Sequence, residues 1–268
     1  MLAGFEEDGI LRMKVVSRLA AACFILAIPV FLITTNVRLL ASNVGFYRHG
    51  FREYNAAAAT GISLPQLDRA GQDIVNYFED DATALHILVT RNGQEVALFN
   101  TREINHMKDV KSLVDLVYRL NEISLVVIIS YIAAVFLWAR EKPIRALAYQ
   151  ALGGVGLGFA VVAGIGAFAL TGFNAAWTRF HEIVFRNNLW ELNPATDHLI
   201  QMFPEKFWEE STTIVAGLTF SEVTVIVALS LGYLIHTRRR DDESAAGGAV
   251  RRERPASAAP GAAAATDR

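Results

Sequence analysis

The chain has 268 residues, of which 53% are hydrophobic and only 19% are charged, and its formal net charge at pH 7 is -2. A soluble domain carries about 25% charged residues. Here the apolar residues gather in long runs, which indicates a membrane protein. This composition excludes a disordered chain, a collagen-like chain and a small disulfide scaffold. The small net charge gives no basic field for nucleic acid. The single cysteine, Cys23, allows no intramolecular disulfide.

Four segments are long and apolar enough to cross a bilayer, because about 20 helical residues span a hydrocarbon core of roughly 30 Å. They cover about 15–36, 123–139, 147–173 and 212–235. Pro29 lies inside the first segment, where we expect it to kink the helix or break one backbone hydrogen bond. The first segment starts like a signal peptide, but its apolar run is long and no convincing cleavage site follows. We therefore expect an uncleaved span.

Short basic flanks predict the orientation, because lysine and arginine next to spans stay in the cytoplasm. If the chain crosses four times, three basic clusters fall on one side, so both termini are expected in the cytoplasm. The clusters are Arg12, Lys14 and Arg18; Arg140, Lys142 and Arg145; and Arg238, Arg239 and Arg240. The outer side then receives two stretches, 37–122 and 174–211, which we expect to form an extracytoplasmic cap.

Local patterns in the first outer stretch predict a small α+β cap. Ser63 could begin a helix over 64–78, whose apolar residues recur at helical spacing. The alternating segments 85–89 and 96–99 flank Asn92-Gly93, which is a strong hairpin signal. We expect residues 1–240 to form one four-span membrane domain with this cap. Residues 241–268, rich in alanine, glycine, proline and arginine, are expected to be a disordered cytoplasmic tail.

Small residues and one carboxylate stand out inside the spans. Gly154 and Gly158 have the spacing that lets two helices approach closely, and tight intramolecular packing is favoured over a dimer contact. Glu222 lies near the middle of the fourth span, where a lipid-facing carboxylate costs about 3 kcal/mol. We expect it to face the bundle or a wet cavity. Its role could be functional, or it could be a neutral carboxyl bonded to a neighbouring helix.

Two histidines are the leading candidates for chemistry. His106 lies in a polar stretch before the second span, with Glu103 and Asp109 at helical spacing on either side. Flanking carboxylates would orient the imidazole and favour its protonated form. His181 follows the third span, so both histidines should lie at the outer surface and could face one reacting group. With Asp109 or Glu182 they could instead bind a metal, although no HExxH or tight ligand cluster is present.

Several longer motifs resemble the bacterial integral membrane family that contains the lipoprotein intramolecular transacylase. The resemblance covers roughly 15–235. The residues that carry it are Phe99-Asn100-Thr101-Arg102-Glu103-Ile104-Asn105-His106-Met107-Lys108-Asp109-Val110-Lys111, then Phe180-His181 through Asn187 and Trp190 to Pro194, and Asp197 through Leu199-Ile200 to Phe203-Pro204-Glu205. The sequence has Asn188, Asn193 and Trp208 where the family pattern is expected to have Asp, Asp and Phe.

The resemblance implies a reaction on a diacylglyceryl lipoprotein in the bacterial cytoplasmic membrane. One acyl chain moves from the glyceryl sn-2 oxygen to the α-amino group of the N-terminal cysteine, without an outside acyl donor, soluble cofactor or metal. The family's essential histidines match His106 and His181, and either could serve as acid or base. The partners implied are diacylglyceryl lipoproteins and membrane lipid.

A tetrahedral oxyanion would also need hydrogen-bond donors, and the candidates from the sequence are Lys108, Lys111, Asn187, Asn188 and the imidazolium. Trp190 and Glu103 are further supporting residues of the motifs. Two other functions stay open at this point. One is a non-catalytic membrane module whose cap binds or senses lipid or lipoprotein, and the other is a metal-dependent hydrolase at the same surface. The oligomeric state is not predicted.

Overall fold

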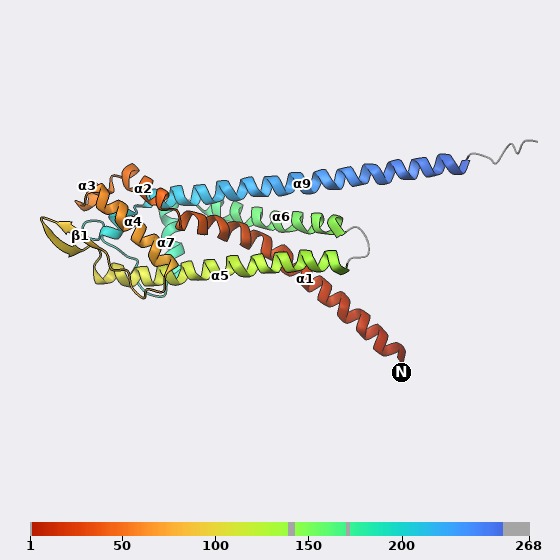
Figure 1. Cartoon of the computed structure of the whole chain (residues 1–268), viewed down its shortest axis with the longest axis horizontal. Helices are drawn as coiled ribbons and strands as arrows, with labels where there is room; N and C mark the ends of the chain where they lie inside the picture. Colours follow the sequence, from red (N-terminus) through yellow and green to blue (C-terminus); the bar gives the residue numbers. More distant parts are fainter. Residues whose placement is uncertain (1, 139–142, 170–171, 254–268) are drawn as a thin grey trace, which may run out of the picture.

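Four long helices run side by side and carry a small cap at one end (Figure 1). The computed structural model describes residues 2–138, 143–169 and 172–253. The long helices are α1 (Leu2–Ala41), α5 (Thr101–Trp138), α6 (Pro143–Ala169) and α9 (Glu205–Glu253). Each contains an apolar stretch long enough to cross a membrane. The fold is therefore a helical polytopic membrane bundle, because only a helix satisfies its own backbone groups in lipid.

The first and fourth predicted spans fall within these helices, and the second, 123–139, does so except for residue 139, which lies outside the described residues. The third predicted span, 147–173, runs past the end of α6 into residues 170–171, which lie outside the described part, and then into α7 (Phe173–Val184). Helix α9 continues to Glu253, so the prediction of disorder is wrong for residues 241–253. Alanine, glutamate and arginine favour helix, and extending an existing helix needs no new nucleus. Residues 254–268 lie outside the described residues.

The glycines of α6 allow a close approach to α1. A Cβ atom added at Gly154 would lie 2.9 Å from the carbonyl oxygen of Ile25, and one at Gly158 would lie 3.0 Å from Cβ of Pro29. Helix α1 runs unbroken through Pro29. The small residues therefore serve intramolecular packing, because helices in lipid associate through close van der Waals contact.

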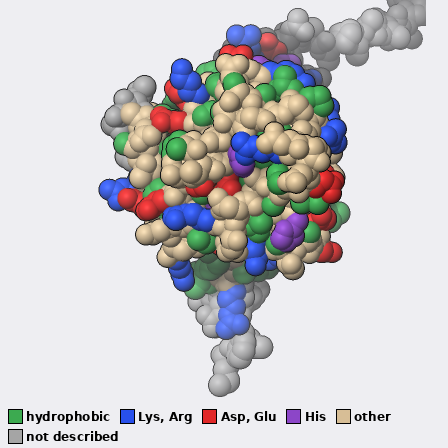
Figure 2. All heavy atoms as spheres, turned by 90° about the vertical axis from the view of Figure 1, so that its left-hand side faces the viewer, with side chains coloured by type: hydrophobic (Ala, Val, Ile, Leu, Met, Phe, Trp, Pro, Cys, Tyr) green, Lys and Arg blue, Asp and Glu red, His purple; other side chains and the backbone are tan. Residues whose placement is uncertain are grey.

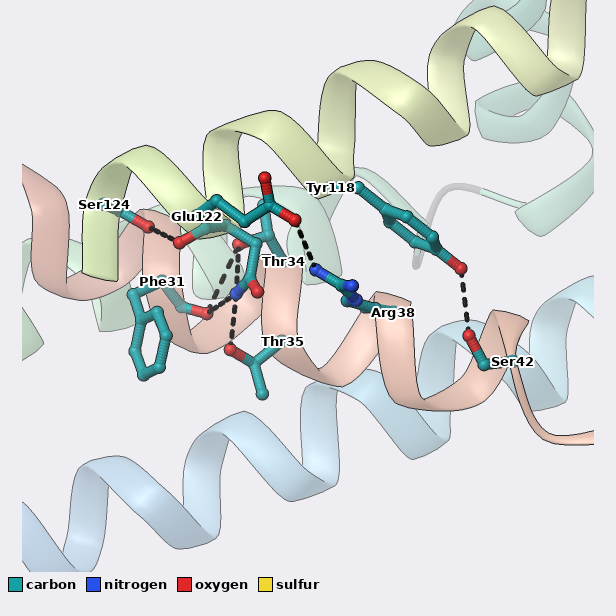
Figure 3. A network of polar contacts seen from close by, with 9 residues as sticks. Phe31, Thr34, Thr35, Arg38, Ser42, Tyr118, Glu122 and Ser124 are labelled. Carbon is teal, nitrogen blue, oxygen red and sulfur yellow. Dashed lines mark hydrogen bonds and ion pairs between the residues drawn. The ribbon is translucent and has the colours of Figure 1, made fainter. Parts of the chain in front are cut away.

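Polar side chains join α1 to α5 at the end near the cap (Figure 3). Asn121 Nδ2 donates to Thr35 Oγ1 at 2.7 Å, and Arg38 Nη1 donates to Glu122 Oε1 at 3.1 Å. Ser42 and Tyr118 share a hydrogen bond of 3.0 Å. These contacts fix the register of the two helices, because an unpaired polar group in the bundle would be costly.

A second polar contact joins α1 to α9 and involves the carboxylate in the fourth span. Asn36, which is 1% exposed, donates from Nδ2 to Glu222 Oε2 at 2.9 Å and to Thr219 Oγ1 at 3.1 Å. Glu222 thus faces a neighbouring helix, as expected from the cost of exposing it to lipid.

The cap contains short helices and one hairpin. Its elements besides α7 are α2 (Val44–Glu53), α3 (Ala56–Thr60), α4 (Leu64–Glu79), β1 (Leu88–Arg91), β2 (Gln94–Ala97) and α8 (His198–Met202). Arg91 pairs with Gln94 across the hairpin, and the intervening Asn92 and Gly93 both have positive φ, 53° and 77°. This is the two-residue turn that the Asn-Gly pair predicts. Ser63 is the residue before α4, but its side chain makes no capping hydrogen bond.

The cap has its own apolar core, which holds α2, α4 and α8 together. Its centre includes Phe51, Leu67, Ile74, Leu98 and Met202, each at most 1% exposed. Figure 2 views the cap end of the molecule, where acidic and basic side chains are interspersed. The cap is therefore a packed unit with a solvated outer face.

The basic clusters lie at the end of the bundle opposite the cap. The N-terminal part of α1, the end of α5, the start of α6 and the end of α9 are all at that end (Figure 1). Arg145 at the start of α6 forms an ion pair of 3.2 Å with Asp241 of α9. Arg140 and Lys142 lie outside the described residues. Successive long helices therefore run in opposite directions between the cap and the far end of the bundle, as four membrane crossings require.

The close α1–α6 packing gives a prediction with a matched control. Gly154→Ala should lower the thermal unfolding midpoint in detergent, because its Cβ would meet the backbone of α1, with an expected cost of about 1–3 kcal/mol. Gly156→Ala should leave the midpoint unchanged or raise it, because nothing lies within 4 Å of a Cβ there and alanine favours helix over glycine by about 1 kcal/mol. Equal effects of both substitutions would contradict the packing.

Candidate functional site

The structure brings His106 and His181 together at the junction of the cap and the bundle. Their ring centroids are 6.1 Å apart, and the residues are 7% and 8% exposed. Helix α5 has 38 residues, or about 57 Å, roughly twice the hydrocarbon thickness. Its apolar segment forms the second half, so its first turns, which carry His106, project beyond the membrane. His181 comes from α7, which lies in the cap.

The first turn of α5 is fixed by Asn100 and Glu103. Asn100 N–H donates to Glu103 Oε2 at 2.7 Å, and Glu103 N–H donates to Asn100 Oδ1 at 3.1 Å. This reciprocal pair is a capping box, which satisfies two backbone donors at the helix start. The other oxygen, Oε1, accepts from the N–H of Leu199 at 2.6 Å. Burial raises the pKa of Glu103, and the two backbone hydrogen bonds oppose that shift.

Glu103 therefore does not orient His106, which corrects the role expected from their spacing. Its oxygens accept from the backbone N–H groups of Asn100 and of Leu199 in α8. Helical periodicity does not reveal the contact with α8. Asp109 accepts from Asn187 Nδ2 at 2.9 Å. Burial lowers the pKa of His106 to about 4, His181 acts in the same direction and Asp109 opposes it. Burial thus opposes the protonated imidazole expected from the flanking carboxylates, because desolvation outweighs one nearby carboxylate.

His181 has a defined tautomer. Its Nδ1 lies 2.8 Å from the carbonyl oxygen of Trp177. A carbonyl only accepts, so Nδ1 carries the hydrogen and Nε2 of the neutral ring is an acceptor. Burial lowers the pKa of His181, and the hydrogen bond to Trp177 opposes the shift. Both histidines are thus held neutral near pH 7.

Aromatic rings surround the pair and limit its contact with water. The ring of Phe185 lies 5.2 Å from that of His106, and Trp190 lies 5.0 Å from His181. Trp177 packs edge-on against His181 at 4.7 Å and stacks on Trp208 at 4.9 Å. Of these rings, Trp190 was expected as a supporting residue, and Trp208 was noted only as a departure from the family pattern.

A cavity of about 470 Å³ lies against the two histidines and continues between α7, α8 and the start of α9. Its wall includes His106, His181 and Trp190. Among the described residues, Nδ1 of His106 is one of the few buried side-chain atoms without a hydrogen-bond partner. The site therefore offers a desolvated volume with two neutral imidazoles at one end.

Of the expected oxyanion donors, the histidines line this cavity, whereas the two lysines and the two asparagines do not. Lys111 Nζ donates to the carbonyl oxygens of Tyr77 and Asp80, which anchors the end of α4. Lys108 is exposed and borders a separate hollow of about 620 Å³. Residues 106 and 108 point about 200° apart around a helix, so the lysine faces another side of α5. Neither lysine lines the cavity: Lys108 faces another side of α5, and Lys111 is bonded to the end of α4.

The two asparagines serve the loop after α7. The side chain of Asn187 donates to Asp109 and accepts from the N–H of Leu189 at 3.0 Å. The backbone carbonyl of Asn188 accepts from Arg102 Nη2, and that of Leu189 accepts from Arg102 Nε at 3.4 Å. Arg102 was not singled out from the sequence, and no local pattern identifies a contact to distant carbonyls.

Asp197 is a second residue that the sequence reasoning did not weigh. It is 7% exposed. Its carboxylate accepts from Asn100 Nδ2 at 3.0 Å and from the N–H of Asn193 at 2.8 Å. Asp197 therefore joins the N-terminal end of α5 to the loop that precedes α8. The only local signal was its place directly before a short helix.

The metal alternative gains no support from this geometry. Within residues 2–138, 143–169 and 172–253, no group of three or more His, Cys, Asp or Glu side chains is arranged to hold an ion. Glu182, one of the expected ligands, pairs with Arg179 at 2.6 Å.

These features define a multi-pass helical membrane protein with a histidine-lined cavity beneath a cap. The sequence model of the family "Lipoprotein intramolecular transacylase Lit" matches residues 22–208, well over half of the chain. The chain belongs to this family of bacterial membrane proteins, and the family supports lipoprotein transacylase function in general terms.

Solved structures agree in fold. The lipoprotein intramolecular transacylase Lit from Bacillus cereus aligns with a TM-score of 0.68 over 85% of this chain and 99% of that one, at 15% identity. A second structure of the same protein, with one histidine replaced by arginine, gives 0.66 over 88% and 99%, also at 15% identity. An uncharacterized protein of Aquifex aeolicus (strain VF5) is 30% identical over 130 residues, 48% of this chain and 54% of that protein. The match spans about half of that relative.

The lowered pKa of His106 predicts acid sensitivity. An unfolded histidine binds protons below pH 6.5, whereas the folded one does so only near pH 4, so stability should rise with pH between these values. The change across this window is about 3 kcal/mol, at roughly 1.4 kcal/mol per pH unit. Thermal unfolding in detergent at a series of pH values measures it.

Two glutamine variants separate this contribution from those of other groups. His106→Gln should flatten the pH dependence between 4 and 6.5. His86→Gln, at an exposed cap residue, should leave the dependence as in the wild type. Identical profiles for all three proteins would contradict a depressed pKa at His106.

Proposed function

We propose that this protein catalyses intramolecular acyl transfer on a diacylglyceryl lipoprotein, from the glyceryl sn-2 ester to the α-amino group of the N-terminal cysteine. The observation that carries the proposal is the pair of buried, neutral histidines facing one cavity at the junction of cap and bundle, in a chain of the transacylase family. No outside acyl donor or cofactor is needed, because donor and acceptor belong to the same substrate.

The proposed reaction needs one base and one route for a proton to the leaving group. The amine nitrogen attacks the ester carbonyl carbon, a C–N bond forms, and the nitrogen gives its proton to an imidazole. The tetrahedral intermediate then loses the glyceryl oxygen as the C–O bond breaks, and that oxygen receives a proton. The product has an N-acyl chain and a lyso-glyceryl group.

We assign the base role to His181. Its Nδ1–H is held by the carbonyl of Trp177, which leaves Nε2 as the acceptor, and the same carbonyl favours the imidazolium once it forms. The protonated His181 can then supply the proton to the departing oxygen. This is the arrangement in which one group orients the ring and the other nitrogen performs the proton transfer.

We propose that His106 donates a hydrogen bond to the oxyanion that develops on the ester carbonyl oxygen. Its low pKa keeps the ring neutral, and a neutral imidazole presents one N–H donor. A donor fixed in a desolvated site stabilises charge more than one in water, because it needs no reorganisation during the reaction. This assignment replaces Lys108, Lys111 and the asparagines as donors.

The cavity itself contributes orientation. Its aromatic wall excludes water that would otherwise hydrolyse the ester. Holding the amine against the ester of the same molecule makes the step unimolecular, and effective molarities for such steps are very large. The partners proposed are therefore diacylglyceryl lipoproteins within a lipid membrane.

We also propose that both termini lie in the cytoplasm, so that the cap and cavity are on the outer face. Support comes from the basic residues at the end opposite the cap, such as Arg12, Lys14 and Arg238. A reporter enzyme that is active only in the cytoplasm, fused after residue 268, should be active. Inactivity of that fusion would reverse the orientation.

The reaction is tested in a host that lacks its own enzyme for N-acylating lipoproteins. Expression of this protein should convert diacylglyceryl lipoproteins to the lyso form, as seen by mass spectrometry of the N-terminal peptide. His106→Ala and His181→Ala should each lower conversion by about 10²–10⁴-fold. His86→Ala, outside the cavity, should convert at the wild-type rate.

Two outcomes would count against the proposal. Wild-type conversion by both cavity variants would remove the histidines from the mechanism. Unchanged lipoproteins together with copurifying lipid would favour the alternative of a binding or sensing module.

A further inference from the structure

The charged side chains among the described residues that line the histidine cavity are acidic. Among the described residues that line it, Glu191 and Glu205 carry the charges near pH 7, and neither lysine nor arginine is present. The two histidines are neutral. A ligand that enters this space therefore meets two carboxylates and no cation, which favours a positively charged group.

Glu205 is held at the side of the cavity away from the histidines. It is the first residue of α9, where the helix N-terminus stabilises a negative side chain. Its Oε2 accepts from Asn174 Nδ2 at 2.7 Å. A carboxylate can accept about four hydrogen bonds, so this contact positions the group and leaves capacity for a ligand.

Tryptophan rings add to the preference for a cation. Trp177, Trp190 and Trp208 line the same cavity. The faces of tryptophan rings attract ammonium groups. Trp177 stacks on Trp208 and on Phe180, so we assign this attraction to Trp190 and to the second face of Trp208. Aromatic walls with carboxylates at one side form a site for an organic ammonium ion rather than for an anion or a purely apolar chain.

An independent observation indicates that a polar ligand belongs here. His106 is 7% exposed, lines the cavity, and its Nδ1 is buried without a hydrogen-bond partner. Buried polar atoms are normally satisfied. The cavity wall therefore contains a buried polar ring whose hydrogen bonds the chain does not complete by itself.

We propose that the carboxylates of Glu191 and Glu205 recognise the protonated α-amino group of the lipoprotein's N-terminal cysteine, so that the cavity selects substrates whose amine is still free. This inference rests on the proposed function and names the substrate feature that the site reads. The carboxylates are positioning groups. One of these carboxylates accepts the first proton of the ammonium group and passes it to solvent. The neutral amine then attacks the ester, and His181 takes the second proton as the C–N bond forms.

The residues along α7 provide two successive positions for the substrate amine, first beside Glu205 and then beside the histidines. Asn174, Trp177 and His181 share one face of the helix, and seven residues correspond to about 10 Å. An ammonium group bound beside Glu205 and Asn174 therefore lies about 10 Å from the histidines along α7. Acylation converts the amine to an uncharged amide, which the carboxylates no longer hold, and this favours product release.

The test measures binding rather than turnover, with ligands that cannot react. They are two synthetic S-(dialkyl ether)glyceryl cysteinyl peptides, one with a free amine and one N-acetylated, added to the full-length protein in detergent. Quenching of tryptophan fluorescence gives each dissociation constant. The wild type should prefer the free amine by about five- to tenfold, as expected for one or two partly exposed ion pairs.

Charge-neutral variants locate the preference. Glu191→Gln and Glu205→Gln should each reduce it, and the double variant should bind both peptides equally. Glu209→Gln, an exposed residue one turn further along α9, makes the same charge change outside the cavity and should keep the wild-type preference. Thermal unfolding midpoints confirm that the variants are folded.

The outcomes separate this inference from the proposed function. Equal binding of both peptides by the wild type, or a preference that survives the double substitution, would overturn the role of the carboxylates and leave acyl transfer intact. Failure to bind either peptide would count against both. Phosphatidylethanolamine, which also carries an ammonium group, should compete weakly; competition as strong as that of the free-amine peptide would assign the site to lipid headgroups.

Discussion

The carboxylate of Glu103 joins the separate parts of the chain that form the histidine cavity. One oxygen closes the start of α5 through Asn100, and the other accepts the N–H of Leu199 at the start of α8. A buried carboxyl without partners costs several kcal/mol, so this contact is satisfied only when the loop between α7 and α8 lies against α5. Asp197 and Arg102 hold the same loop at other points. The opposition of His181 and His106 follows from this attachment.

Burial then decides the chemistry of the pair. Two imidazoles with centroids 6.1 Å apart, enclosed by aromatic rings, cannot both be charged without a large desolvation cost. They are held neutral, so one can accept a proton and the other can donate a hydrogen bond at neutral pH. In the proposed reaction, the same enclosure limits the access of water to the substrate ester. Among the described residues that line the cavity, the remaining charges belong to Glu191 and Glu205. Glu205 is held by Asn174, which lies about 10 Å from His181 along α7.

The bundle places this site at a constant height relative to the membrane. Helices in lipid associate through shape and polar contacts rather than the hydrophobic effect. The glycines of α6 and the side chains of Asn36 and Asn121 supply both. Helix α5 is longer than the hydrocarbon is thick, so it continues without interruption into the cap. A rigid element therefore links the spans to His106, which suits a reaction on a lipid-anchored substrate.

The sequence by itself determined the four spans, the Asn-Gly hairpin, the helix over 64–78 and the choice of His106 and His181, because hydropathy, turn chemistry and local motifs act over a few residues. It gave Lys108 a place that its side of α5 does not allow. It also did not reveal the contacts that Glu103, Lys111, Arg102 and Asp197 make with residues 31 to 97 positions away. Helical spacing shows which residues share a face but not what that face meets. Only tertiary structure decided that burial would neutralise the histidines, because desolvation depends on side chains gathered from α5, α7 and the following loop.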